Sequence, residues 1–349
     1  MSQVRVLIVD DSATMRQLIR FRLRADPRIE VVGEASDTAQ AREALDTLSP
    51  DVMTLDVEMP GQSGLDFLRE VMRSRPMPVI MVSTETEKGS AAAVEALSRG
   101  AIDCVGKPRS REFNNAFGDL ARLVHGAATA RVQPRGAAEG AQPPVVSRDF
   151  QWNGMYVLIG SSTGGVDALE RIIAGMPANC PPILITQHMS DGFLASFAER
   201  INSRYAPRVE LARSDAPVEQ GRIYLAPGGE QHLTMTVGAR PRCRLIGGEK
   251  VSSHRPSVDV LFNSALPLGN RVCAALLTGM GSDGADGMLA LRRAGATCLA
   301  QDEASSVVWG MPRIAWEQGA AHRLVPLKRM ASEILDATDR RGRMSRAPR

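Results

Sequence analysis

The segment MYVLIGSSTGGVDALERII, residues 155–173, joins an apolar run to a helix-like run through a turn of small residues. The run MYVLI is typical of a buried strand, and VDALERII carries apolar residues at helical spacing. The turn between them, GSSTGG, has the glycine and hydroxyl residues of a tight connection. The segment therefore predicts one strand–turn–helix unit of an α/β domain.

Similar strand patterns continue along the second half of the chain. They are PPILITQ, RIYLAP, RVCAALLTG, ATCLAQD and HRLVPL. Helix-like runs such as GFLASFAERINSR lie between several of them, and strands that alternate with helices predict a mostly parallel sheet. We therefore predict an α/β domain over residues 153–340 with a doubly wound, Rossmann-like sheet. A less regular stretch over about 207–250 predicts added hairpins.

The first half of the chain alternates strand and helix patterns five times. Its strand-like runs are VRVLIVD, IEVVGE, DVMTLD, PVIMVS and IDCVG. Five such units predict a flavodoxin-like (βα)5 domain over residues 1–125, which is also doubly wound. Residues 126–152, which are rich in Ala, Gly, Pro, Gln and Arg, are predicted to be a flexible linker. The basic C-terminal residues 341–349 are predicted to be a disordered tail.

The composition is that of a globular protein, with 44% hydrophobic and 23% charged residues. A formal net charge of +3 gives no overall indication of nucleic-acid binding. Five scattered cysteines without a CxxC pair indicate reduced thiols rather than a disulfide framework. There is neither a signal-peptide pattern nor a run of about 18 apolar residues. We therefore expect a cytoplasmic protein without membrane insertion.

Acidic residues follow two strands of the predicted first domain. Asp10 and Asp11 close the first strand, and Asp56 closes the third. Because the carboxyl ends of parallel strands share one edge, these carboxylates should meet there, and hard oxygen ligands favour Mg²⁺. Ser83 ends the fourth strand and Lys107 follows the fifth. The whole set suits phosphoryl transfer onto Asp56, whereas Asp10 or Asp11 taken alone is equally well explained as a helix cap.

The turn GSSTG, Gly160–Gly164, fits the G-x-S-x-G pattern of a nucleophile elbow. In such an elbow a sharp turn lifts Ser162 to the edge of the sheet, next to unpaired N–H groups of the following helix. As a bare motif, a purely structural turn is the commoner explanation. The next strand ends in His188, and an imidazole is a suitable base for a serine. For His188 alone, a capping or core histidine is the alternative.

A third strand end adds an acid, because RVCAALLTG runs into a glycine-rich turn that carries Asp283. Asp283 would orient His188 as the acid of a catalytic triad, and N–H groups around Met280 would bind an oxyanion. Asp283 taken alone is equally well explained as a helix cap. The chain order Ser–His–Asp differs from the Ser–Asp–His order of α/β-hydrolases and disfavours a lipase-type enzyme.

The same turn offers a competing interpretation. GMGSDG, Gly279–Gly284, fits the G-x-G-x-x-G dinucleotide fingerprint, and Asp302 lies near the spacing of a ribose-binding acid. This fingerprint comes late in its domain and leaves Ser162 and His188 unexplained. The alternative function is therefore a phosphorylation-controlled binding protein with a nucleotide-binding or non-catalytic output domain.

Residues 1–125 resemble response-regulator receiver domains through VDDS, LDVEMPGQSGLDFL, MVST and GAIDCVGKP, in the family's order and spacing. The resemblance implies that a sensor histidine kinase is the phosphodonor for Asp56. It also implies that Ser83 and Lys107 sense the phosphoryl group. The implied ligands of Mg²⁺ are Asp10, Asp11, Asp56 and the carbonyl of Glu58.

Residues 156–340 resemble the catalytic domain of chemotaxis protein-glutamate methylesterases through IGSSTGG, ITQHM, IYLAPGGEQHL, HRPSVDVLF, LLTGMGSDGADGM and AQDEASSVVWGMP. The resemblance implies phosphorylation-activated demethylation of glutamate methyl esters, and deamidation of glutamines, on chemoreceptors in chemotaxis adaptation. It makes Ser162 the nucleophile, His188 the base and Asp283 the orienting acid, with no cofactor for the esterase reaction.

The sequence leaves the roles of three further residues open. The family more often has alanine at the position of Ser161, so two adjacent serines compete for the nucleophile role, and the motif position favours Ser162. His232 and His254 lie in matching stretches. Either they line a substrate groove or they make surface or core contacts.

Overall fold

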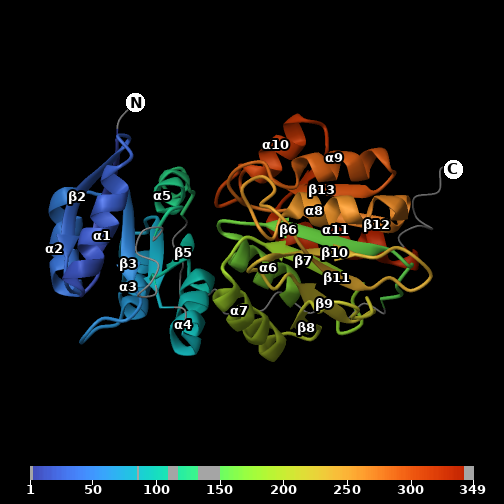
Figure 1. Ribbon diagram of the computed structural model, residues 1–349, viewed down its shortest axis with the longest axis horizontal. Helices are drawn as coiled ribbons and strands as arrows, with labels where there is room; N and C mark the ends of the chain where they lie inside the picture. The colour runs from blue at the N-terminus through green and yellow to red at the C-terminus, as the bar shows by residue number, and fades with distance from the viewer. Residues whose placement is uncertain (1–2, 85, 109–116, 133–149, 342–349) are drawn as a thin grey trace. The chain divides into compact units, whose positions relative to one another are not determined.

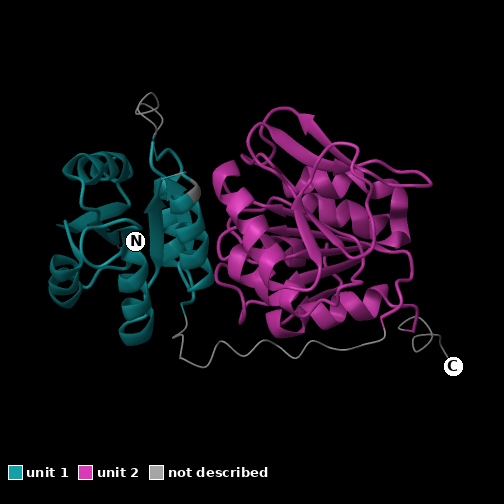
Figure 2. Ribbon diagram, turned by 90° about the horizontal axis from the view of Figure 1, so that it is seen from below, with its two compact units in different colours: residues 1–140 teal, residues 141–349 magenta. Residues whose placement is uncertain are grey.

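The computed structural model describes residues 3–84, 86–108, 117–132 and 150–341. The chain divides into two compact units, residues 1–140 and 141–349, which Figure 2 draws in teal and magenta. Each unit is built on a parallel sheet of its own.

The first unit is a five-stranded parallel sheet in the order β2-β1-β3-β4-β5, with helices between the strands (Figure 1). Its elements are β1 (Val4–Val9), α1 (Ala13–Arg24), β2 (Ile29–Ala35), α2 (Thr38–Leu48), β3 (Val52–Asp56), α3 (Gly64–Ser74), β4 (Val79–Ser83), α4 (Glu87–Ser98), β5 (Asp103–Gly106) and α5 (Leu120–Ala128). Since β1 lies between β2 and β3, the winding reverses there, and the carboxyl ends of β1 and β3 flank a topological switch point. The predicted (βα)5 fold is confirmed.

The second unit is a seven-stranded parallel sheet in the order β14-β13-β12-β6-β7-β9-β8. The strands and helices up to the hairpin are β6 (Tyr156–Ser161), α6 (Gly165–Ala174), β7 (Ile183–Gln187), α7 (Asp191–Arg204), β8 (Arg208–Leu211), β9 (Arg222–Leu225), β10 (Gln231–Met235) and β11 (Cys243–Gly247). The remaining elements are α8 (Val258–Ser264), the 3₁₀ helix η2 (Leu266–Arg271), β12 (Val272–Leu276), α9 (Ala285–Arg293), β13 (Thr297–Gln301), α10 (Met311–Glu317), β14 (Arg323–Val325) and α11 (Leu327–Thr338). The predicted doubly wound sheet is confirmed.

The region predicted to hold added hairpins contains one, the antiparallel pair β10–β11. The other two strands of that region, β8 and β9, pair in parallel and extend the main sheet next to β7. Residues 212–221 connect β8 to β9 without a helix. The alternation of strand and helix patterns that marks a parallel sheet is therefore missing there, which explains the difference from the prediction.

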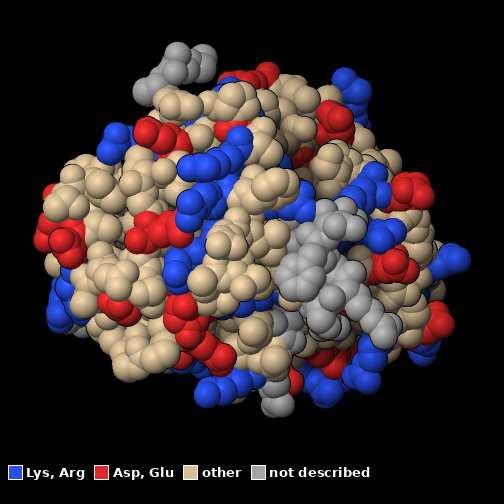
Figure 3. Space-filling view, turned by 60° about the vertical axis from the view of Figure 1, so that its left-hand side comes forward, with Lys and Arg blue, Asp and Glu red and all other residues tan. Residues whose placement is uncertain are grey.

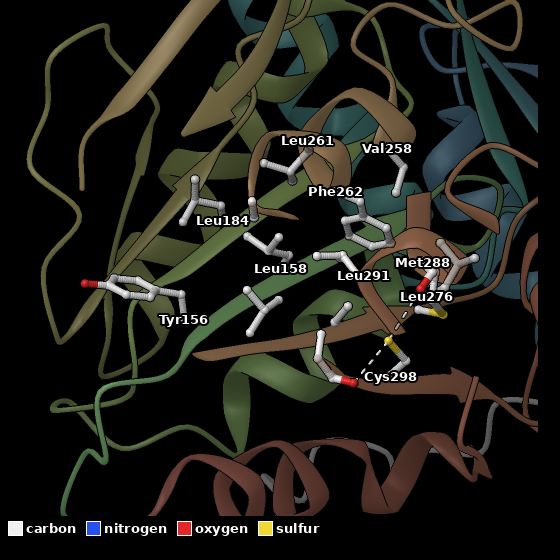
Figure 4. Packing of buried hydrophobic residues seen from close by; sticks show 14 of the residues in the cluster. Tyr156, Leu158, Leu184, Val258, Leu261, Phe262, Leu276, Met288, Leu291 and Cys298 are labelled. Atoms are coloured by element: carbon white, nitrogen blue, oxygen red, sulfur yellow. Dashed lines mark hydrogen bonds between the residues drawn. The ribbon is translucent and has the colours of Figure 1, made fainter. Parts of the chain in front are cut away.

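Apolar side chains pack between this sheet and helices α8 and α9. Leu158 of β6, Phe262 of α8 and Leu291 of α9 are completely buried in one cluster (Figure 4). Burying one such side chain stabilises the fold by about 1.5–3 kcal/mol relative to leaving it exposed. This packing fixes α8 over the sheet and so determines where the first turn of that helix lies.

The structure also bears on where the predicted linker begins and ends. Helix α5 runs to Ala128, so residues 126–128 are helical, because Leu123, Val124 and Ala127 form a buried helical face. At the other end Phe150 is buried and Trp152 forms a bridge with Asp339. Residues 133–149 of the predicted linker and residues 342–349 of the predicted tail lie outside the described residues.

All five cysteines of the chain are free and buried. Burial raises the pKa of the Cys180, Cys243 and Cys298 thiols to about 12, so these thiols stay protonated at neutral pH. Acidic and basic side chains both occur across the face drawn in Figure 3. Within the described part of the chain, no helix combines the length and the apolar composition that crossing a membrane requires.

Candidate functional site

Strands β6, β7 and β12 are neighbours in the second sheet, and their carboxyl ends form one edge (Figure 1). Ser161, the last residue of β6, pairs with Gln187, the last residue of β7. Ser162 and His188 therefore leave the sheet side by side. The winding of the sheet reverses between β6 and β12, and α/β proteins bind ligands at such a switch point.

His188 and Asp283 are in direct contact at this edge, with 2.8 Å between Nε2 of His188 and Oδ2 of Asp283. The imidazole is 6% exposed and the carboxylate is fully buried. Three more groups donate to the carboxylate from the start of α8: the Ser257 hydroxyl at 2.7 Å, the Val258 N–H at 2.7 Å and the Asp259 N–H at 3.1 Å. These contacts hold Asp283 in one orientation and, through it, the imidazole.

The pKa of the Asp283 carboxyl is lowered to about 2. Burial by itself raises this pKa, but the hydrogen bonds from His188, Ser257 and the Val258 N–H favour the carboxylate more strongly. Asp283 is therefore ionised at neutral pH. The stability that follows from its depressed pKa is present above the ordinary value of 3.8 and is lost as the pH falls toward 2.

The second ring nitrogen of His188, Nδ1, is buried and has no hydrogen-bond partner among the described residues. When Asp283 holds the proton on Nε2, Nδ1 carries the lone pair of the neutral ring and can accept a proton. His254 stacks on the same ring, with centroids 3.7 Å apart and an angle of 5° between the planes. His188 is thus held at its edge by Asp283 and across its face by His254.

Ser162 lies beside this pair and is 5% exposed. Its N–H donates to the carbonyl of Thr278, and the His188 N–H donates to the carbonyl of Ser161, both over 3.0 Å. Among the described residues no hydrogen bond joins the Ser162 hydroxyl to Nδ1 of His188. The structure therefore brings His188 and Asp283 into contact and places Ser162 at the neighbouring strand end. Catalytic hydrogen bonds are often long before substrate binds.

Met280, the predicted oxyanion donor, lies in the turn after β12. The preceding residue, Gly279, packs directly on Ser162, because a Cβ at position 279 would lie 2.7 Å from the Cβ of Ser162. Any side chain at position 279 would collide with the serine. The main chain that leads into Met280 therefore runs against Ser162, and the role of its N–H as an oxyanion donor stays a prediction.

In the first unit the carboxylates of Asp10, Asp11 and Asp56 meet at the carboxyl ends of β1 and β3, with their oxygens within 4.8 Å of one another. The Nζ atom of Lys107 lies 2.7 Å from Oδ2 of Asp56 and 3.0 Å from Oδ2 of Asp10. Burial raises the pKa of Asp56 to about 6, with the Lys107 hydrogen bond opposing this and the Asp10 charge adding to it.

The other two predicted residues of this cluster lie beside Asp56. Ser83 is the last residue of β4, and its buried hydroxyl donates to the carbonyl of Gly89 over 3.0 Å. The Glu58 N–H donates to Oδ1 of Asp56 over 3.2 Å. Oδ2 of Asp10 is ion-paired with Lys107 but accepts no hydrogen bond among the described residues. A buried carboxylate oxygen with spare capacity, beside two further carboxylates, fits a hard divalent cation.

Comparison with known proteins decides whether the second unit is a methylesterase or a nucleotide-binding domain. Residues 157–334 match the family described as CheB methylesterase, and residues 6–116 match the response regulator receiver domain. The chain belongs to the CheB methylesterase family. It is 52% identical over 335 residues to protein-glutamate methylesterase/protein-glutamine glutaminase 1 of Rhizobium johnstonii, and the match covers 96% of each chain.

Two further similarities support the CheB assignment. The chain is 50% identical over 343 residues to protein-glutamate methylesterase/protein-glutamine glutaminase 1 of Caulobacter vibrioides, covering 98% of this chain and 100% of that one. The crystal structure of the Thermotoga maritima CheB methylesterase catalytic domain is 34% identical, with a TM-score of 0.51, and covers 52% of this chain and 98% of that one. The enzyme class predicted from the sequence, a chemotaxis methylesterase and glutaminase with a receiver domain, is confirmed.

The turn at 279–284, which fits a dinucleotide fingerprint in sequence, instead carries Asp283 into contact with His188 and with the start of α8. Sequence reasoning missed the first turn of α8 as the support for Asp283. Ser257 precedes α8 as an N-cap, a signal present in HRPSVDVLF, but its hydrogen bond to Asp283 spans 26 positions. A contact over that distance leaves no local pattern in a single sequence.

His232, for which a groove and a core contact were both open, is 2% exposed. Its Nδ1 accepts a hydrogen bond from the Ser257 N–H at 3.1 Å, and its Nε2 lies 3.0 Å from the Glu249 carbonyl. His232 therefore supports the residue that caps α8. His254, whose role the sequence also left open, contacts the imidazole of His188.

Asp259 provides a prediction for pH dependence. Burial raises its pKa to about 6, with the nearby Asp283 charge adding to the shift and the Gly287 N–H opposing it. Because this pKa is raised above its unfolded value, stability is lost as the pH rises from 3.8 to about 6, and the full cost of ionising Asp259 is present above that range. Asp259→Asn keeps an acceptor for the Gly287 N–H, which lies 2.7 Å from Oδ1, and removes the charge. The variant should therefore gain more stability, relative to wild type, at alkaline than at acidic pH.

Unfolding followed by tryptophan fluorescence measures this difference, because Trp152, Trp309 and Trp316 are the chain's three tryptophans and all belong to the second unit. Asp286→Asn, an exposed carboxylate in the first turn of α9, is the matched control and should show no such pH dependence. A stability difference for Asp259→Asn that is the same on both sides of its pKa would contradict the prediction.

Proposed function

We propose that this enzyme is a phosphorylation-activated serine hydrolase that demethylates glutamate γ-methyl esters, and deamidates glutamines, on chemoreceptors in chemotaxis adaptation. The observation that carries the proposal is the buried His188–Asp283 pair next to Ser162. This pair leaves Nδ1 of His188 without a partner among the described residues. Family membership supports the substrate class.

In the proposed reaction the Ser162 hydroxyl attacks the ester carbonyl while Nδ1 of His188 takes its proton. Asp283 stabilises the imidazolium that results, since it is ionised and accepts from Nε2. The Met280 N–H would donate to the tetrahedral oxyanion. His188 then returns the proton to the departing oxygen, and methanol leaves.

In the second half of the reaction His188 removes a proton from water, which attacks the Ser162 acyl ester. His188 then gives this proton to the departing Ser162 oxygen, which restores the serine and leaves glutamate. With a glutamine substrate the same steps release ammonia in place of methanol. No cofactor takes part in these steps. Proton transfer by a positioned histidine contributes about 10²–10⁴-fold to the rate.

The receiver supplies the regulation in this proposal. A sensor histidine kinase is the phosphodonor and Asp56 the acceptor, with Ser83 and Lys107 sensing the phosphoryl group. The phosphoryl group carries about −1.5 to −2 charges. Mg²⁺ held by Asp10, Asp11, Asp56 and the Glu58 carbonyl would offset the negative charge of the phosphoryl oxygens. A cytoplasmic location suits these partners and the five free, buried cysteines.

Methanol release from methylated chemoreceptor, with and without a small-molecule phosphodonor and Mg²⁺, tests the proposal. The phosphodonor should raise the wild-type rate. Asp56→Asn should show no rise above its own starting rate, because the acceptor carboxylate is gone. Asp46→Asn, an exposed aspartate on α2, is the matched control and should respond like wild type. A phosphodonor response that survives in Asp56→Asn would contradict the assignment of the phosphorylation site.

A further inference from the structure

Gln187 is buried beneath the candidate active site, with 2% of its surface exposed. Both polar atoms of its side-chain amide form hydrogen bonds. Nε2 donates to the carbonyl of Ser162 over 2.9 Å and to the carbonyl of His188 over 3.1 Å. Oε1 accepts a hydrogen bond of 2.6 Å from the hydroxyl of Ser161.

This amide therefore connects the main chains of the proposed nucleophile and the proposed base. Both residues lie just beyond the last paired positions of their strands, and the N–H of each still donates to the main chain of a neighbouring strand end. The two N–H groups of one planar amide bind the carbonyls of the same two residues. A change in the position of Gln187 would move Ser162 and His188 relative to each other.

The glycine at the start of α6 shows how closely the chain is built around this amide. A Cβ at Gly165 would lie 2.1 Å from Oε1 of Gln187 and 2.8 Å from the Cβ of Ser161. The last glycine of GSSTGG, Gly165, thus leaves space for the amide. Ser161, whose hydroxyl donates to that amide, is completely buried.

We infer that Gln187 is a positioning residue of the hydrolase, because its amide binds the main chains of both Ser162 and His188 and so fixes their relative position. Ser161 assists by fixing the amide and is not a second nucleophile. The inference rests on the proposed function, since it concerns the geometry of that reaction. It predicts an effect on turnover rather than on substrate binding.

Gln187→Met tests this role, because methionine has a similar length and fills the site without hydrogen bonds. We expect kcat for methanol release to fall by about 10²-fold, as for a misplacement of about 1 Å, with KM changed by less than about threefold. Gln220→Met is the matched control, since the exposed amide of Gln220 donates to the Asn179 carbonyl away from this edge. Its kcat should stay within about twofold of wild type.

Gln187→Glu adds a readout that a purely structural role would not move. At alkaline pH the carboxylate faces two carbonyl oxygens without a donor, and burial raises its pKa. As the pH falls, the protonated carboxyl regains one O–H donor. The kcat of this variant relative to wild type at the same pH should therefore rise several-fold between about pH 8 and pH 6. Ser161→Ala, which removes only the bond to Oε1, should lower kcat by about two- to fivefold.

Folding is checked in every variant by tryptophan fluorescence. A folded Gln187→Met with kcat within about twofold of wild type would overturn the inference. If Gln187→Met does not fold, the pH series of Gln187→Glu decides, and a constant ratio to wild type would overturn it. Full activity in Gln187→Met beside an inactive Ser162→Ala removes this inference alone, whereas an active Ser162→Ala removes the proposed function itself.

Discussion

Alanine in place of Ser162 is expected to leave less than about a thousandth of the wild-type rate of ester hydrolysis. The serine oxygen forms the acyl bond in the proposed reaction, and no neighbouring group replaces it. The hydroxyl of Ser161 is buried and bonded to Gln187 over 2.6 Å, so it does not reach a substrate. Methanol release from methylated chemoreceptor, expressed per folded molecule, measures the loss.

Two other serine variants make this result specific. Ser203→Ala, at an exposed position near the end of α7, should keep the wild-type rate. Ser161→Ala should keep about a fifth of the rate or more, since it loses one supporting hydrogen bond and no reacting atom. Near-normal turnover in Ser162→Ala, or a deeper loss in Ser161→Ala than in Ser162→Ala, would reject Ser162 as the nucleophile.

Asparagine in place of Asp283 is expected to lower kcat by about 10³–10⁴-fold, as the same exchange does in a serine protease triad. The carboxylate accepts from Nε2 of His188 over 2.8 Å and so keeps the lone pair on Nδ1. An amide presents an N–H group to the ring and favours the opposite tautomer, with the proton on the nitrogen that should act as the base. The imidazolium also loses its negative partner.

Methanol release and the pH dependence of kcat measure this loss. Asp286→Asn, at an exposed position in the first turn of α9, is the matched control and should be close to wild type in activity. Tryptophan fluorescence separates lost chemistry from lost folding, which matters because the start of α8 donates three hydrogen bonds to Asp283. A folded Asp283→Asn with less than about a tenfold loss would exclude Asp283 as the orienting acid.

Both parallel sheets are predictable from the sequence because buried parallel strands are continuous apolar runs and their helices have a different period. Ser162 and His188 end consecutive strands of such a sheet, and consecutive strands are usually neighbours. Their proximity is therefore foreseeable. Asp283 is harder to place, because β12 pairs with β6 although many elements separate them in the chain. The sequence suggested it only as the acid of a glycine-rich turn after another strand and through the resemblance to methylesterases, and the catalytic roles of all three residues stay predictions.

The supporting contacts could not be predicted. Ser257 reads as a helix cap, yet its hydroxyl also donates to Asp283 on another element. Gln187 reads as the polar end of an apolar strand, and nothing local shows that its amide turns back onto two carbonyls. Such contacts depend on the packing of segments that are distant in sequence. The strand β8 was misassigned to a hairpin for the same reason, since its partner is fixed by the finished sheet.

The position of β6 has a consequence for synthesis of the chain on the ribosome. β6 pairs with β7 on one side and with β12 on the other, and β12 is translated much later. Until residues 272–276 emerge, one side of β6 lacks its partner, and an unpaired apolar strand edge invites association with other chains. Nascent protein that stops before β12 therefore has no complete site and exposes a surface that chaperones and proteases recognise.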